Sequence, residues 1–231
     1  MPARDPYDPP LSIVPRRKTM PAGTVLWRCH SVKYPAHAFK PQPTRSPFQG
    51  GRFDATLEEP FPYLYAAQRP AVALAEVLLR SLPFEGPEGQ RLIPWARASL
   101  YALTRVTTVR PLELVRLVSE RDLAAVSQSG WLLEADAMLY PHTRYWGHAL
   151  RRSADWAQGM EWQSRRCRPH RAYLLFGDRC GAEVLRATEA GENGEVVSYE
   201  LGDPADAREI NRMLARAGLR SAIALPDGGP H

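Results

Sequence analysis

The sequence predicts an α+β fold built as a single domain. Predicted strands and helices mix along the 231 residues without a regular strand–helix–strand alternation, which argues against a doubly wound parallel sheet. No long low-complexity linker divides the interior, and 44% hydrophobic with 24% charged residues is an ordinary globular composition. We therefore expect one domain over residues 24–225. It follows an extended, poorly ordered arm over residues 1–23, which is rich in Pro and Arg and lacks periodicity.

The most informative segment runs from Gly50 to Leu82. It predicts a glycine turn that carries Arg52, a short strand that carries Tyr65, and a helix that begins at Pro70, where the missing N–H costs nothing. Glu76 lies in the middle of a broad apolar surface of that helix. A carboxylate in such a place must be paired, neutralised or exposed to a cavity. Each feature alone has an ordinary structural explanation, but their convergence in one short segment indicates a functional site.

The expected strand Thr24–His30 comes first in the domain. Its Arg28 is either an arginine on the solvent face of an edge strand or a cation that reaches an anionic ligand. A proline-rich loop, Ser31–Gln49, leads to the glycine turn. After the Glu76 helix, one or two strands are expected within residues 91–109 and another over 112–117.

Two helices are expected between residues 119 and 158. Ser119 with Asp122 three residues later is an acidic variant of the capping box, and that helix should end near Gly130. The second helix spans residues 143–158 with Gly159 as its C′ glycine. Its inward face is expected to include Tyr145, Trp146, Ala149, Leu150 and Ala154, and its solvated face Arg151 and Arg152.

A short buried strand with Met160 and Trp162 should follow, with Ser164 at its end. No GxSxG sequence surrounds Ser164, so it is not interpreted as a hydrolase nucleophile. The remaining elements are expected to be a strand over 171–177, an exposed hairpin of 182–187 and 196–201 around a 191–194 turn, a helix over 204–217 and a strand over 221–225.

Composition limits the functional classes. The net charge of +5 permits an anionic ligand without requiring nucleic acid. Cys29, Cys167 and Cys180 have no spacing suited to zinc, and none of the six histidines suggests a metal site or a triad. The N-terminus has no apolar signal-peptide core and no apolar run could span a bilayer, so we expect a soluble cytoplasmic protein.

The order GGRF, YLYA, ALAEVL and then GMEWQSR resembles the RES domain over about residues 24–188. That family is named for an Arg, a Glu and a Ser, which match Arg52, Glu76 and Ser164. The arginine of its first strand matches Arg28 in LWRC, and its tyrosine before the helix matches Tyr65. The chain departs from the family pattern where Asp54 replaces the usual Asn and where Trp162-Gln163 replaces Tyr-Pro.

The resemblance implies an ADP-ribosyltransferase-like mixed sheet flanked by helices that binds NAD as a substrate, without a metal. It further implies a toxin of a type II toxin–antitoxin pair that cleaves the nicotinamide–ribose bond by hydrolysis or phosphorolysis. Glu76 would stabilise the positive charge that develops on the ribose. Arg28 and Arg52 would bind the diphosphate, Tyr65 would stack on nicotinamide, and Ser164 would orient a phosphate or ribose oxygen.

The partner implied by the resemblance is a helix-turn-helix antitoxin that covers the cleft, and homo-oligomers within such a complex remain open. Two alternatives remain. The first is ADP-ribosyl transfer to a cellular protein. The second is a non-catalytic basic module that binds nucleic acid, which the cluster Arg165, Arg166, Arg168 and Arg171 suggests. No recognition-helix or aromatic RNA-binding motif supports the second alternative, so no direct nucleic-acid binding is expected.

Overall fold

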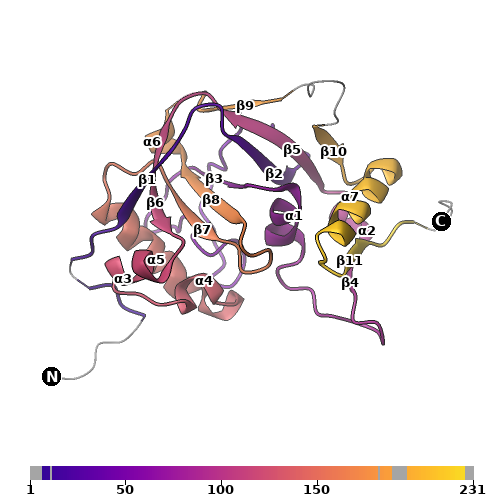
Figure 1. Ribbon diagram of the computed structural model, residues 1–231, viewed down its shortest axis with the longest axis horizontal. Coiled ribbons are helices and arrows are strands. Elements are labelled where there is room, and N and C mark those ends of the chain that lie inside the picture. The colour runs from indigo at the N-terminus through magenta and orange to yellow at the C-terminus, as the bar shows by residue number, and fades with distance from the viewer. Residues whose placement is uncertain (1–6, 11, 182, 189–196, 227–231) are drawn as a thin grey trace.

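The computed structural model describes residues 7–10, 12–181, 183–188 and 197–226. One mixed β-sheet runs through the molecule in the order β1-β6-β7-β8-β3-β2-β5-β10, with β9 also paired to β5 (Figure 1). The pairing of β6 with β7 is parallel and the other pairings in this sheet are antiparallel. The strands are β1 (Arg16–Met20), β2 (Val25–Ser31), β3 (Tyr63–Ala67), β5 (Tyr101–Thr108), β6 (Leu112–Leu117), β7 (Gly159–Gln163), β8 (Arg171–Phe176), β9 (Leu185–Ala187) and β10 (Ser198–Glu200).

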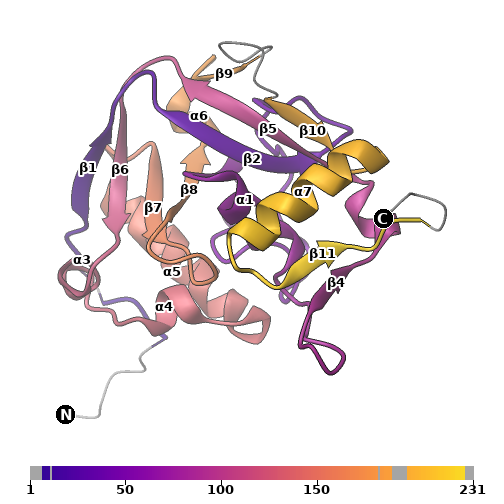
Figure 2. The same ribbon diagram turned by 45° about the vertical axis from the view of Figure 1, so that its right-hand side comes forward.

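A second, parallel pair consists of β4 (Arg91–Ile93) and β11 (Ser221–Ile223). Figure 2 shows this pair with α7 beside α1, while α3, α4 and α5 lie at the other end of the molecule. The helices are α1 (Pro70–Leu78), α2 (Trp95–Ala98), α3 (Glu120–Ala125), α4 (Trp131–Glu134), α5 (Tyr140–Ser153), α6 (Gly177–Cys180) and α7 (Pro204–Arg216), with a 3₁₀ turn at Ala137–Leu139. The expected single-domain α+β fold with a mixed sheet flanked by helices is confirmed.

The two faces of the sheet bury different cores. The inner face packs against apolar residues of α1, α5 and α7, such as Leu74, Trp146 and Ile210. The outer face buries a smaller cluster that includes Leu26, Leu64 and Cys180. Since strand side chains alternate between faces, β2, β3, β5, β6 and β8 each contribute to both cores. No helix in the described part of the chain is long and apolar enough to cross a membrane.

Strands β2 and β3 are joined by one residue pair only, Trp27 with Ala67. On its other edge β2 pairs with β5 along its whole length, from Val25 to Ser31, and β3 pairs with β8 from Tyr63 to Ala67. The two strands therefore diverge beyond Trp27 while each stays anchored to its other neighbour. This divergence creates the space in which the candidate site lies.

Three predictions about where helices and strands begin and end are wrong. Residues 16–20, expected within the poorly ordered arm, form β1, whose edge pairs with β6 over five residues. The Ser119 capping box is confirmed, but α3 ends at Ala125 and a separate helix, α4, begins at Trp131. Gly159 does not cap α5 but begins β7, where an added Cβ would lie 2.4 Å from the Leu174 carbonyl oxygen.

The expected hairpin is also wrong. β9 and β10 do not pair with each other: β9 pairs with Val106–Thr108 of β5, and β10 pairs with Ala102–Thr104 of the same strand. They therefore lie end to end along one edge of β5. The turn expected at 191–194 lies outside the described residues.

Candidate active site

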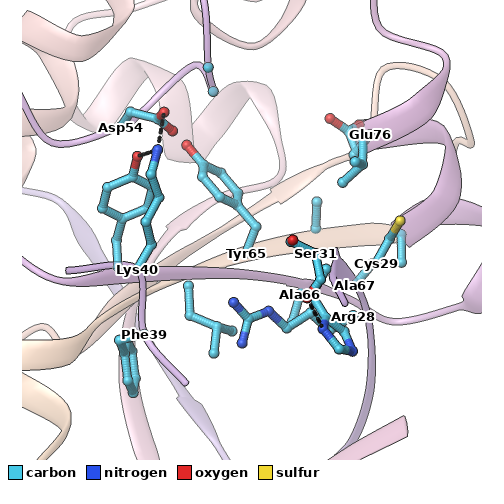
Figure 3. A pocket seen from close by; sticks show the side chains of 18 of the residues that line it. Arg28, Cys29, Ser31, Phe39, Lys40, Asp54, Tyr65, Ala66, Ala67 and Glu76 are labelled. Atoms are coloured by element: carbon cyan, nitrogen blue, oxygen red, sulfur yellow. Dashed lines mark hydrogen bonds and ion pairs between the residues drawn. The ribbon is translucent and has the colours of Figure 1, made fainter. Parts of the chain in front are cut away.

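A cavity of about 430 Å³ opens where β2 and β3 diverge. Its lining includes Arg52 from the glycine turn, Tyr65 from β3, Glu76 from α1, and Tyr140 at the start of α5. Figure 3 shows Tyr65 and Glu76 on the same side of the sheet, with Asp54 and Lys40 at the other end of the cavity from Glu76. The volume lies within the range of small-molecule sites, which is roughly 300–1,000 Å³.

Glu76 is held by a serine. Ser164 Oγ donates a hydrogen bond of 2.7 Å to Glu76 Oε1. Ser164 is fully buried and lies just after β7, while Glu76 is half-buried and lines the cavity. Ser164 does not line the cavity, and the residue that it contacts there is Glu76. Glu76 Oε2 has no hydrogen-bond partner among the described residues.

Arg52 and Arg166 lie near Glu76 without forming an ion pair with it. No arginine nitrogen of the described residues lies within 4.0 Å of its carboxylate. Burial lowers the pKa values of Arg52 and Arg166, and in both cases the negative charge of Glu76 acts in the opposite direction. Arg52 is 8% exposed, and its Nη2 donates to the Ala135 carbonyl at 3.1 Å. The expected neighbours thus share one cavity, but Glu76 and Arg52 do not form a close ion pair.

Tyr65 forms part of the cavity wall. Its hydroxyl accepts a hydrogen bond of 3.1 Å from the Phe53 N–H, and its ring packs edge-on against Trp162, with 6.1 Å between centroids. Burial is the main cause that raises the Tyr65 pKa well above its usual value, so the phenol stays protonated. The ring is therefore a fixed aromatic surface beside the carboxylate.

The turn that carries Arg52 requires its two glycines. Gly50 has a φ of +82°, a conformation that favours glycine. A Cβ on Gly51 would lie 2.3 Å from Asp54 Oδ1 and 2.5 Å from the Tyr65 hydroxyl. Asp54 is 2% exposed and accepts a hydrogen bond of 2.6 Å from Thr44 Oγ1. Close packing of the turn against β3 thus excludes any side chain at position 51.

The N-terminal half of α5 fixes the same turn from the other side. Arg144 is 3% exposed and donates to the carbonyl oxygens of Gly51 at 3.1 Å, Ser46 at 2.8 Å and Pro47 at 2.9 Å, and also to that of Gln49. Thr143 Oγ1 donates to the Arg52 carbonyl at 2.7 Å. Sequence reasoning missed Arg144 and placed Tyr145 inward, whereas Tyr145 is 47% exposed.

Arg28 also lines the cavity, but its side chain lies on the other face of the sheet from Tyr65. Alternation along β2 puts it on the side of Leu26 and the outer cluster, while Cys29 belongs to the inner cluster with Leu74. Figure 3 shows its guanidinium across the β3 ribbon from Tyr65. Arg28 Nη1 donates to the carbonyl oxygens of Ala36 and Ala38 at 2.5 and 2.6 Å. Burial lowers the pKa of Arg28 to about 10.

Arg80 was not singled out from the sequence. It lines the cavity four residues after Glu76, and its guanidinium carbon lies 5.7 Å from the centroid of the Tyr140 ring. In an Arg-rich chain no sequence pattern separates it from surface arginines. Within the described residues, no group of three or more His, Cys, Asp or Glu side chains is arranged to hold a metal ion.

The sequence model of the RES domain matches residues 25–197. The fold is similar to a chain in the crystal structure of the M. tuberculosis MbcT–MbcA toxin–antitoxin complex. The TM-score is 0.51 at 15% identity, and the match covers 74% of this chain and 84% of that chain. This likeness identifies an ADP-ribosyltransferase-like fold. No curated protein sequence matches significantly.

Proposed function

Because this chain belongs to the RES domain family, we propose that it is an NAD-consuming toxin that cleaves the nicotinamide–ribose bond. The observation that carries the proposal is Glu76 in the cavity wall. One carboxylate oxygen is fixed by Ser164 at 2.7 Å, and the other is without a partner among the described residues. A carboxylate that is oriented but not neutralised is suited to oppose a positive charge that forms only during reaction.

Cleavage of the nicotinamide–ribose bond builds positive charge on the ribose, as in glycoside cleavage. Glu76 Oε2 would accept a hydrogen bond from a ribose hydroxyl and face the developing oxocarbenium ion. The low-dielectric wall formed by Trp162 and Tyr65 strengthens this electrostatic effect. Nicotinamide leaves as a neutral molecule, so the site needs no general acid.

The other side chains have binding roles in this proposal. Tyr65, fixed edge-on against Trp162, would stack on the nicotinamide ring. Arg52 would contribute positive charge toward the diphosphate, and Arg28 would contribute through its position at the opening between β2 and β3. Ser164 would act through Glu76, because it is fully buried behind that residue.

The partner proposed is an antitoxin with a helix-turn-helix region that covers the cavity. The similar structure is of a toxin–antitoxin complex, which supports this proposal by analogy. Whether the neighbouring reading frame encodes a small helix-turn-helix protein tests it directly, and co-purification of the two proteins is the expected result.

Incubation of the purified protein with NAD tests the activity. We expect release of nicotinamide, and Glu76→Gln should abolish it while thermal unfolding stays unchanged. Parallel reactions with and without inorganic phosphate distinguish phosphorolysis, which yields phosphorylated ADP-ribose, from hydrolysis, which yields ADP-ribose. Full turnover by Glu76→Gln would refute the assigned role.

ADP-ribosyl transfer to a protein is the alternative that the same site supports, because both reactions break the same bond. Labelled NAD with cell lysate separates them: a labelled protein band indicates transfer. The nucleic-acid alternative has less support. The four arginines that suggested nucleic-acid binding all make hydrogen bonds within the chain. Arg165 and Arg168 both donate to Glu134. Arg166 donates to the Arg80 carbonyl, and Arg171 donates to the Glu161 carboxylate. A gel shift without a salt-sensitive complex would remove that alternative.

A further inference from the structure

Three arginines line the cavity, Arg28, Arg52 and Arg80, and they differ in how deeply their guanidinium groups are buried. The comparison matters because NAD carries a diphosphate, which guanidinium groups bind in a bidentate manner. The inference below rests on the proposed function. It concerns which of these three guanidinium groups contacts that diphosphate.

Arg28 and Arg52 are both deeply buried and already bound to main-chain oxygens. Arg28 is 9% exposed and Arg52 is 8% exposed. Arg28 Nη1 donates to two carbonyl groups, at Ala36 and Ala38. Arg52 Nη2 donates to the Ala135 carbonyl. Binding a ligand phosphate with Arg28 Nη1 or Arg52 Nη2 would leave buried carbonyl oxygens without a donor. Arg52 Nε has no partner among the described residues, but it is buried.

Arg80 is held differently. It is only partly buried, and its Nη2 donates to the Glu76 carbonyl at 3.0 Å, in the last turn of α1. The Tyr140 ring lies against the guanidinium, and the Arg80 carbonyl accepts a 2.5 Å hydrogen bond from Arg166 Nη2. Nε and Nη1 of Arg80 have no hydrogen-bond partner among the described residues. The side chain is thus oriented and keeps donors for a ligand.

The position of Arg80 relative to Glu76 fits a dinucleotide. Arg80 follows Glu76 by four residues and lies just after the end of α1 at Leu78, and both residues line the cavity. In NAD the diphosphate is joined directly to the nicotinamide ribose. A ribose held at Glu76 therefore brings the diphosphate toward the neighbouring turn. Arg52 and Tyr65 line the same cavity as Arg80.

We propose that Arg80 is a substrate-binding residue that contacts the diphosphate of NAD through Nε and Nη1. The Tyr140 ring lies 5.7 Å from the guanidinium carbon, and the hydrogen bond to the Glu76 carbonyl links the guanidinium to the helix that carries the carboxylate. Binding of the phosphates and placement of the ribose are then coupled through a single short segment of the chain.

The test compares substrates with and without a diphosphate. For Arg80→Gln, kcat/KM for NAD should fall about 10- to 100-fold, mainly through KM, because charge-assisted hydrogen bonds are lost. Cleavage of nicotinamide riboside, which lacks phosphate, should change less than about twofold, since a substrate without phosphate groups makes no such bond. Arg80→Lys should recover only part of the loss, since it keeps the charge without the planar fork.

Arg97→Gln is the matched control. Arg97 is also partly buried and donates from Nη2 to a carbonyl of the same helix turn, that of Val77, at 3.0 Å. Unlike Arg80, it does not line the cavity. We expect its kcat/KM for NAD to match that of the unchanged protein. Equal losses in Arg80→Gln for both substrates, or equal losses in Arg80→Gln and Arg97→Gln, would overturn the assignment.

Binding of ADP-ribose, measured by calorimetry, tests Arg80 without turnover. This molecule contains the diphosphate but no nicotinamide bond, so its affinity for Arg80→Gln should fall by a similar factor. Undiminished affinity refutes the role of Arg80 even if the unchanged protein cleaves NAD. Failure of the unchanged protein to release nicotinamide, with an intact effect of Arg80→Gln on ADP-ribose binding, refutes the proposed reaction instead.

Discussion

Two glutamates on opposite faces of the sheet show two ways to accommodate a carboxylate in a folded protein. Glu161, in β7, is 4% exposed and lies between Arg171 at 3.3 Å and Arg116 at 3.6 Å. Glu76, on the other face, has a serine hydroxyl at 2.7 Å and no arginine within 4.0 Å. Ser164 and Glu161 are three residues apart, so one short segment carries both Glu161 and the serine that binds Glu76.

The difference is in what remains available to a ligand. The charge of Glu161 is offset by two cations that bridge β6, β7 and β8. Glu76 is oriented by a neutral donor, so its negative charge is largely retained within the cavity. A nearby carboxylate is most useful to a reaction when its charge is directed at the position where positive charge appears. The proposal that Glu76 is catalytic and Glu161 structural depends on this contrast.

The largest expected effect tests that contrast directly. Glu76→Gln should lower kcat for NAD cleavage by about 1,000-fold or more, because the charge that opposes the oxocarbenium ion is removed. Glu161→Gln should leave kcat within about twofold, since it lies on the other face of the sheet. Steady-state nicotinamide release from both variants provides the measurement. Similar losses in the two variants would remove the distinction.

Arg144→Met tests whether hydrogen bonds to the main chain, rather than ion pairs, stabilise the turn that carries Arg52. The substitution removes a side chain that donates to several carbonyl groups, so the free energy of unfolding should fall by about 2–4 kcal/mol. Arg179→Met is the control, because Arg179 donates to the carbonyls of Arg151, Ala154 and Ala157 near the other end of α5. Urea unfolding should show losses in both variants, but KM for NAD should rise only in Arg144→Met. If KM for NAD is unchanged in Arg144→Met, the turn that carries Arg52 does not contribute to substrate binding.

Ser164→Ala should have a smaller effect on the same carboxylate. Loss of the 2.7 Å hydrogen bond leaves Glu76 charged but less well oriented, so kcat should fall about tenfold. KM should change little, because Ser164 does not line the cavity. Rescue by Ser164→Thr, which restores a hydroxyl, would support an orienting role. A rise in KM with unchanged kcat would instead indicate that Ser164 contacts the substrate.

The smallest effect concerns the pH dependence of Glu161. Burial is the largest cause of its raised pKa, and Arg171 and Arg116 oppose the shift. A carboxylate whose pKa is higher in the folded than in the unfolded state stabilises the fold below its unfolded pKa, and this contribution is lost as pH rises through the folded pKa. Relative to Glu161→Gln, the unchanged protein should therefore gain about 1 kcal/mol or less between pH 7 and pH 4. Urea unfolding at both pH values measures this gain, and a relative loss on acidification would contradict it.

The sequence predicted most of the local structure of the site. Arg52, Tyr65 and Glu76 occur in consecutive segments whose glycines, alternation and helical period indicate a turn, a strand and a helix, and all three line one cavity. Their roles toward NAD stay predictions. Ser164 was expected to orient a ligand oxygen, whereas it contacts Glu76 itself, a distinction that depends on packing between β7 and α1.

What the sequence could not indicate depends on pairing between distant segments. The side of the sheet from which Arg28 approaches follows from the register of β2 with β5 and β3. The pairing of both β9 and β10 with β5 contradicts the local hairpin pattern. Arg144 and Arg80 were overlooked because, among 30 basic residues, the type alone does not distinguish a buried arginine from a solvated one.

The single residue pair between β2 and β3 also has a consequence for how such a pocket can change in size. Additional ladder bonds between these strands would narrow the entrance, and loss of the remaining one would widen it. Either change would also move Arg28 and Tyr65, which lie on these two strands and line the cavity. The width of the opening is thus linked, through backbone pairing, to the positions of side chains proposed to bind the substrate.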